Sequence, residues 1–311
     1  MNMTERDFQR VVVETAKAAP ETAKAAHQDA RPHGRGSGRL LFSPALLYAP
    51  PLIFLGLFFI IPLTLIAWMS FTEPAPGFGN YVKFFSSPRA LGILAETVLT
   101  AGTVTICALF VAYPVAYVAA TRNSAFGNIL LLIVALSFWT NFLVRTYAWM
   151  VIFSNNGPAQ AALAAFGWNP PPRLLYTSFA STLAMTQMLT PLMVFMLYAV
   201  MRRIDGAYLQ AAGSLGATPA RAFLTVFLPL SAPGIINGVT LVFITCMGFY
   251  VTPILIGSPR DMMISGLIAE QMEQFLDFGG ASASSMILLV FTLVLFSVYN
   301  AFFDIEKIWR R

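Results

Sequence analysis

Six long apolar segments, separated by polar stretches, organise the chain. Each is long enough to provide the ~20 residues that a bilayer crossing needs. All six are predicted to be helices, because an open strand edge cannot satisfy its backbone groups in lipid. The first segment contains Pro50, Pro51 and Pro62, which predicts a kink or a late helix start. The segments lie near residues 45–71, 95–120, 129–153, 179–200, 234–256 and 284–303.

A polar stretch at residues 208–233, between the fourth and fifth segments, predicts two short helices joined by a bend. The first helix contains residues 209–212. Gly216 marks the bend, because glycine adopts positive φ without a Cβ clash. Thr218 is a favourable N-cap and Pro219 a favourable first helical residue, so the second helix begins there. It is predicted to end before Pro229. A helix–bend–helix at a membrane face is a knob that can dock into a cleft on a partner.

This stretch resembles the coupling loop of ABC importer permeases. The family pattern is Glu-Ala-Ala, three residues, Gly, nine residues, Ile, one residue, then Leu-Pro. Glutamine replaces the family's glutamate and keeps its size but not its charge, so an ion pair to the ATPase is not expected at that position; valine replaces isoleucine. The matching residues are Gln210, Ala211, Ala212, Gly216, Val226, Leu228 and Pro229.

The resemblance implies an all-α integral membrane fold, the type I importer permease fold, with six transmembrane helices and a cytoplasmic coupling loop. The permease domain would then comprise residues 41–311, with the coupling loop at about 202–232. The segment FWTNFLVRTYAWM at residues 138–150, followed by SNNG, is similar to permeases of the spermidine/putrescine type, a subfamily that also includes opine-like importers. Together these likenesses cover roughly residues 45–305.

The family implies several partners and a mechanism. A second, related permease would supply the other half of the path, two cytoplasmic ATPase subunits would power it, and a periplasmic binding protein would deliver a small amine solute. Transport would then proceed by alternating access. The chain is expected in the inner membrane of a bacterium.

Composition supports a multi-pass protein in a lipid bilayer. The chain is 57% hydrophobic and 11% charged, against about 25% charged residues in soluble domains. The net charge of +5 does not indicate a nucleic-acid partner, because the basic residues lie beside the apolar segments. Residues 1–40 are polar and predicted to form a disordered cytoplasmic tail.

The distribution of Lys and Arg predicts that both termini and the coupling loop are cytoplasmic, since inner loops carry the excess of positive charge. With the N-terminus inside, the outer set is Lys83, Arg89, Arg173 and Arg260. The larger inner set is Arg31, Arg35, Arg39, Arg122, Arg202, Arg203, Arg221, Lys307, Arg310 and Arg311.

Arg145 makes the third segment the most informative about a translocation path. A charged residue at such depth costs about 2.5–3.5 kcal/mol on insertion scales, so it normally faces a cavity or a partner. On a continuous helix Asn141 lies one turn earlier on the same face, and Phe138 and Trp149 continue that face. A structural role stays open as well: Arg145 could pair with Glu96 or bind helix-end carbonyls.

Other segments offer weaker candidates. Tyr250 could line the path or belong to the interfacial aromatic belt, while Gly248 and Thr245 are predicted to pack helices. Gln187 and Thr190-Pro191 suggest a bend, with either role open. The third outer loop, residues 257–283, carries a possible acidic rim that could attract a cationic solute or hold ordinary solvated charges: Asp261, Glu270, Glu273 and Asp277.

Several chemistries have no support in the sequence. The phosphate-binding pattern Gly-x-x-x-x-Gly-Lys-Ser/Thr is missing, so ATP hydrolysis is assigned to partner subunits. The two histidines lie in the tail, Cys107 and Cys246 are expected to be small buried hydrophobes, and no metal, cofactor or catalytic group is predicted. The alternative is an ion-gradient-driven transporter, which would place acidic residues or broken helices in matched halves. A third possibility is an integral-membrane enzyme, which would need polar groups clustered at one depth, and the sequence shows no such cluster.

Overall fold

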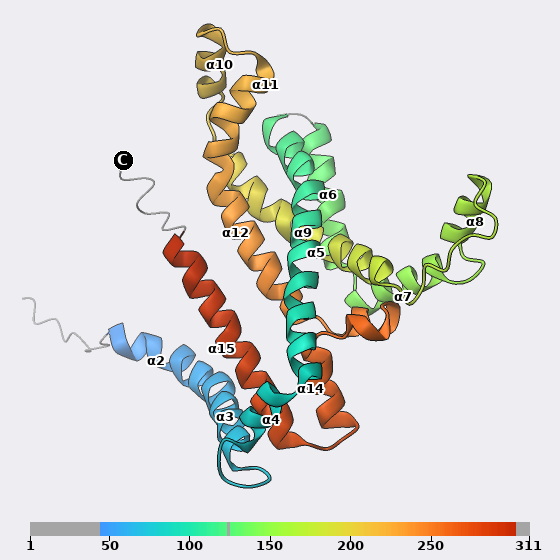
Figure 1. Cartoon of the computed structure of the whole chain (residues 1–311). Helices are drawn as coiled ribbons and strands as arrows, with labels where there is room; N and C mark the ends of the chain where they lie inside the picture. Colours follow the sequence, from blue (N-terminus) through green and yellow to red (C-terminus); the bar gives the residue numbers. More distant parts are fainter. Residues whose placement is uncertain (1–43, 123–124, 303–311) are drawn as a thin grey trace, which may run out of the picture. The chain divides into compact units, whose positions relative to one another are not determined.

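The computed structural model describes residues 44–122 and 125–302, which form helices and no strand (Figure 1). The tail and the six basic residues of the inner set at the two termini lie outside these residues. Among the described residues, five helical stretches are long and apolar enough to cross a membrane, and the bent pair Ala125–Trp139 and Phe142–Ala165 makes a sixth when counted as one span. The five are Pro50–Thr72, Pro88–Thr121, Ser178–Met201, Pro219–Met247 and Phe278–Val298. The expected all-α membrane fold is confirmed.

The first span begins with α2 (Pro44–Leu55), continues through a π-helical turn, η1 (Gly56–Ile60), and ends with α3 (Ile61–Thr72). π-turns are a common cause of helix kinks, so the irregularity expected from the prolines occurs at η1. The chain divides into two compact units at this turn, the first ending at Phe58. All later elements belong to the second unit.

Three helices form the core of the second unit: α5 (Pro88–Thr121), α9 (Ser178–Met201) and α12 (Leu228–Met247), each packed against the other two. On α5 the alanines at 108, 112 and 116 are completely buried. Small residues four apart lie on one helix face and let neighbouring backbones approach. Larger side chains fill the space from α9, chiefly Met185, Met193 and Leu197.

Close packing of α9 against α12 depends on two glycines. A Cβ at Gly234 would lie 3.0 Å from the Cβ of Val200, and one at Gly238 would lie 2.6 Å from the sulfur of Met193. The packing role predicted for Gly248 is wrong, because that residue is exposed just beyond the end of α12. Cys246 is buried as expected, but Cys107 is exposed on α5.

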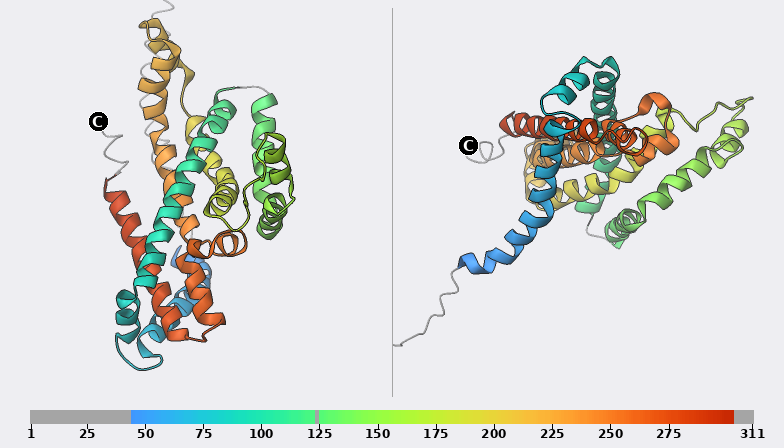
Figure 2. Two further views of the ribbon diagram at one scale, coloured as in Figure 1. Left: turned by 45° about the vertical axis from the view of Figure 1, so that its right-hand side comes forward. Right: turned by 90° about the horizontal axis from the view of Figure 1, so that it is seen from below.

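Helices also occur within the outer loops and between the spans. The third span is α6 (Ala125–Trp139) and α7 (Phe142–Phe153), followed by α8 (Pro158–Ala165). The end opposite the coupling stretch carries α4 (Gly79–Ser86) and α14 (Ile264–Glu273) (Figure 1 and Figure 2). The other elements are α10 (Gly206–Ser214), α11 (Pro219–Ala222), η2 (Phe223–Phe227), α13 (Val251–Ile256), η3 (Pro259–Asp261) and α15 (Phe278–Phe302).

The prediction that the second coupling helix ends before Pro229 is wrong. α11 runs through the π-turn η2 directly into α12, with Pro229 in the first turn of α12. The Leu228 N–H bonds the Phe223 carbonyl five residues back, and this wider turn accommodates the proline ring that would clash in an uninterrupted α-helix.

Replacing Gly234 by leucine tests the α9–α12 packing. Gly234→Leu should lower the free energy of unfolding by about 1–3 kcal/mol, because the added side chain enters the contact with Val200. Gly102→Leu on α5 is the matched control, since no atom lies within 4 Å of a Cβ built there. Thermal unfolding of the purified protein in detergent measures both. Equal melting temperatures for the two variants would contradict this packing.

Candidate functional site

The coupling stretch forms an elbow, which we define as residues 205–222, made of α10, a bend and α11. Gly216 at the bend has φ +85°, a left-handed conformation that favours glycine. The Thr218 hydroxyl accepts from the Arg221 N–H at 3.4 Å, and Pro219 takes the first helical position. These local predictions are confirmed. A further cap was not predicted: Asp205 accepts from the Ala207 N–H at 2.9 Å and starts α10.

The elbow presents an exposed surface of small and apolar residues. Leu215 at the tip is 90% exposed and Tyr208 is 58% exposed. Gln210 and Ala211 are also exposed, whereas Ala212 is half-buried. Of the remaining motif residues, Gly216 and Pro229 are exposed and Val226 and Leu228 are half-buried. Large exposed apolar side chains grouped on a polar elbow are typical of a docking surface.

Aromatic side chains join the base of the elbow to the core. Phe223 and Phe227 of η2 stack on each other, and both meet Tyr117 of α5 edge-on with ring centroids 5.4 and 4.9 Å away. Tyr113 meets Phe223 in the same way, and its hydroxyl lies 2.9 Å from that of Ser231 on α12. Edge-to-face pairs add about 0.5–1.5 kcal/mol beyond burial, so η2, α5 and α12 form one rigid junction.

A second candidate site lies where the third span breaks. The axes of the helical segments on the two sides of residues 140–141 differ by 96°, so the prediction of one continuous helix is wrong. The physical reason is Asn141, whose side chain accepts from the Leu143 N–H at 2.8 Å and caps α7. Non-helical backbone at membrane depth is tolerated only inside protein or beside a water-filled cavity.

The predicted single face is therefore divided between two helices. Phe138 lies on α6, where it meets Phe195 of α9 edge-on, and Asn141 is the cap of α7 rather than part of its polar face. Trp149 donates to Gln187 of α9 at 3.3 Å, and Gln187 donates to Ser137 of α6 at 3.4 Å. Gln187 thus connects the two sides of the break. The sequence of the third segment alone could not predict this role, because Gln187 belongs to α9.

Arg145 also faces α9, next to Gln187. One terminal nitrogen donates to the Met188 carbonyl at 3.5 Å, while Nε is buried without a hydrogen-bond partner among the residues that the structure describes. The suggested pair with Glu96 is not formed, and Met188 lies inside α9 rather than at a helix end. Tyr250 stands apart from this group as the N-cap residue of α13 and is 42% exposed.

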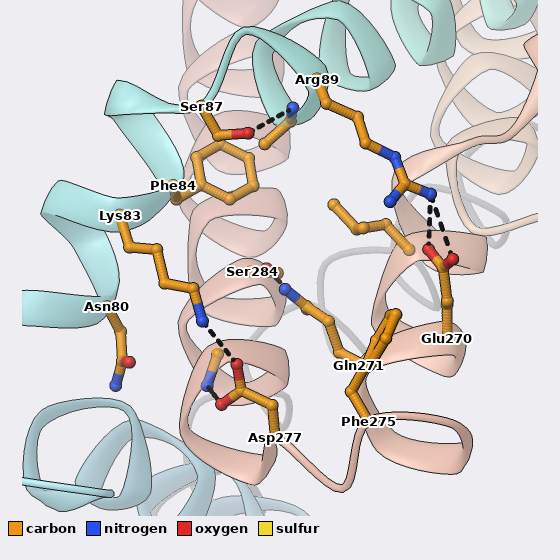
Figure 3. Close-up of a pocket in the computed structure, with 13 residues that line it drawn as sticks. Asn80, Lys83, Phe84, Ser87, Arg89, Glu270, Gln271, Phe275, Asp277 and Ser284 are labelled. Atoms are coloured by element: carbon orange, nitrogen blue, oxygen red, sulfur yellow. Dashed lines mark hydrogen bonds and ion pairs between the residues drawn. The ribbon is translucent and has the colours of Figure 1, made fainter.

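The acidic rim, a third candidate site, is not a free negative surface. A cavity of about 450 Å³ lies here. At its rim Lys83 pairs with Asp277 at 3.0 Å and Arg89 pairs with Glu270 at 2.9 Å (Figure 3). Asp261 is buried and accepts from Ser178 and from the Ser258 N–H. Of the four acids only Glu273 is exposed. Three of these carboxylates therefore have structural partners, only Glu273 fits the interpretation as an ordinary solvated charge, and attraction of a cationic solute stays a prediction.

Comparisons with known proteins agree on one family. Residues 112–305 match the family described as "Binding-protein-dependent transport system inner membrane component". The chain is 30% identical over 225 residues to the spermidine/putrescine transport system permease protein PotB of Haemophilus influenzae, covering 71% of this chain and 78% of that protein. It is 28% identical over 302 residues to the inner membrane ABC transporter permease protein YdcU of Escherichia coli, covering 86% and 92%.

Among solved structures, a chain of a bacterial alginate ABC transporter in complex with an alginate-bound periplasmic protein has the same fold. The TM-score is 0.73 at 18% identity, and the match covers 85% of this chain and 95% of that one.

Substitutions at Asp277 can distinguish the stability contributed by its ion pair from the stability contributed by its helix cap. Its second oxygen accepts from the Gly280 N–H at 2.8 Å at the start of α15. Burial alone would raise the pKa of Asp277, but the Gly280 hydrogen bond and Lys83 together lower it. Lys83→Met and Asp277→Asn should each cost at most about 1 kcal/mol, because Lys83 is exposed and asparagine still caps. Asp277→Ala should cost about 1 kcal/mol more.

Melting temperatures in detergent measure these differences. Because the folded pKa is lowered, the contribution of Asp277 is present above its ordinary pKa of about 3.9 and is lost as the pH falls through the folded value. If Asp277→Asn were as damaging as Asp277→Ala, the capping role would be refuted.

Proposed function

This chain belongs to the family of binding-protein-dependent transport system inner membrane components, and we propose that it imports amine-bearing solutes, with spermidine and putrescine the first candidates. As a permease subunit of an ABC importer, it forms part of a solute path through the bacterial inner membrane. The choice of solute is supported by the likeness to the PotB proteins and by the segment at residues 138–150. Opine-like amines are the second candidates.

The elbow is the observation that carries the mechanism. Its surface is exposed and apolar at Leu215 and Tyr208, and the exposed Ala211 is small enough for a partner surface to approach closely. We assign this surface to docking on one of two cytoplasmic ATPase subunits, which hydrolyse the ATP. Gln210 can donate or accept a hydrogen bond there but forms no ion pair.

Motion of the docked elbow would be transmitted to the solute path along one continuous helix. The helix that begins at Pro219 runs without interruption to Met247, so α12 acts as a lever fixed to the elbow. α12 packs on α5 and α9, and α9 carries Gln187 and Met188 beside the broken span. Closure of the ATPase pair would move these helices together, opening the path outward, and hydrolysis would return it inward.

We assign the elbow end to the cytoplasm, and with it both termini. Arg122, Arg202, Arg203 and Arg221 lie near this end or in the elbow, and none of them has an ion-pair partner among the described residues. At the opposite end, Lys83 and Arg89 are neutralised by acids. An excess of free positive charge inside matches the positive-inside rule. A periplasmic binding protein would then meet the end that carries α4 and α14, and a second permease would complete the path.

The Gly216 conformation provides the test of docking. Gly216→Val should leave the complex in the membrane but abolish uptake, because a left-handed conformation costs a non-glycine residue about 1–2 kcal/mol and β-branching adds to this. A Cβ built at Gly216 or at Gly213 meets no atom within 4 Å. Steric contact therefore does not distinguish the Gly216 variant from its control at Gly213. Gly213→Ala, at a helical position without positive φ, is the matched control and should transport normally.

ATP-dependent, vanadate-sensitive uptake into vesicles containing the assembled importer measures both variants. Normal uptake by Gly216→Val would contradict the docking mechanism. The solute is tested separately by titrating the cognate binding protein with putrescine, spermidine and opines. Saturable binding of one of these is expected, and binding of none of them would overturn the amine assignment.

A further inference from the structure

Arg145 has more hydrogen-bond donors than the described chain satisfies. A guanidinium carries five N–H groups in a fixed fork. Here one donates to the Met188 carbonyl at 3.5 Å, the long limit for such a bond, and the buried Nε has no acceptor within residues 44–122 and 125–302. A buried N–H donor left unpaired is unfavourable, so the arrangement is incomplete.

None of the acidic residues that the structure describes forms an ion pair with Arg145. Asp261, Glu270 and Asp277 have partners of their own, and Asp205 caps α10. The others are Glu73, Glu96 and Glu273, and none forms an ion pair with Arg145. The missing acceptor therefore comes from beyond the described residues.

The expected depth and the direction of Arg145 argue against a lipid phosphate as the acceptor. α6 has 15 residues and is therefore about 22 Å long, short of the ~30 Å hydrocarbon thickness. A helix of this length that enters at one membrane face would place the break at residues 140–141 within the hydrocarbon, and Arg145 follows the break in the first turns of α7. Its guanidinium points to the Met188 carbonyl on α9, toward the interior of the protein.

We infer that Arg145 binds a carboxylate supplied by another molecule of the importer, either an acidic side chain of the second permease or a carboxyl group of the solute. A carboxylate matches the planar fork of arginine and can accept two bonds at once, including one from Nε. A simple polyamine cannot be this ligand, because it carries only positive charge. The inference rests on the proposed function, since it requires the assembled importer.

The site is tested in the complete importer with Arg145→Gln and Arg145→Lys. Uptake should fall at least tenfold in Arg145→Gln and recover in part in Arg145→Lys, which keeps the charge but loses the fork. Tyr147→Phe, on the exposed face of α7, is the matched control and should behave as wild type. Wild-type uptake is measured first, so failure of the proposed function is recognised before any variant is compared.

Two further measurements identify the source of the carboxylate. If the second permease supplies it, Arg145→Gln lowers the melting temperature of the complex, and neutralising one intramembrane acid of that subunit has no additional effect. If the solute supplies it, stability is unchanged, KM rises for carboxylate-bearing amines, and uptake of analogues without the carboxyl group is unaffected. Either result supports the inference.

Two results overturn it. The first is wild-type stability and uptake in both Arg145 variants. The second is non-additivity between Arg145→Gln and Asp304→Asn or Glu306→Gln, which would place the acceptor within this chain.

Discussion

The continuity of the helix from the elbow into α12 is the constraint on which the rest of the structure depends. Pro229 would end or kink an ordinary α-helix, but the π-turn at Phe223–Phe227 carries the chain past it. The same turn directs Phe223 and Phe227 onto Tyr117 of α5. An elbow on a flexible linker could dock on a motor without moving the bundle, whereas this junction connects the proposed docking surface directly to α12 and α5.

The bilayer imposes the second condition, that backbone and charged groups away from regular helices must find partners. At the break in the third span, Asn141 caps α7 and Gln187 connects α6, α9 and α7. Thr146 and Thr252 place α7 and α13 in contact, with their hydroxyls 3.5 Å apart. Among the described residues, Nε of Arg145 and the hydroxyl of Ser181 are buried without a hydrogen-bond partner, and each such group calls for an explanation.

Local signals made much of the fold predictable from the sequence. The six apolar segments and the Gly216–Thr218–Pro219 signals act over a few residues, so their outcome depended little on tertiary context. The break at Asn141 was not predictable from periodicity, because the flanking residues are apolar on both sides. The end expected at Pro229 was wrong for a related reason: a π-turn is a response to packing that leaves no clear mark in the sequence.

Interactions between distant residues were the least predictable. The Arg89–Glu270 pair joins residues 181 positions apart, so Glu270 looked like a free loop charge. Gln187 belongs to the same class, since its partners on α6 and α7 come together only after the third span has bent. The sequence motif located the coupling residues along the chain. The exposure of Leu215 and the aromatic junction beneath the elbow became visible only in the structure.

Photo-crosslinking from the elbow tests the central claim most directly. A benzoylphenylalanine placed at Leu215 in the assembled importer should crosslink to an ATPase subunit, and the same group at Phe85 on α4, at the opposite end of the second unit, should not. Mass spectrometry of the crosslinked product identifies the partner. A product lacking the ATPase at Leu215, or one containing it at Phe85, would contradict the account.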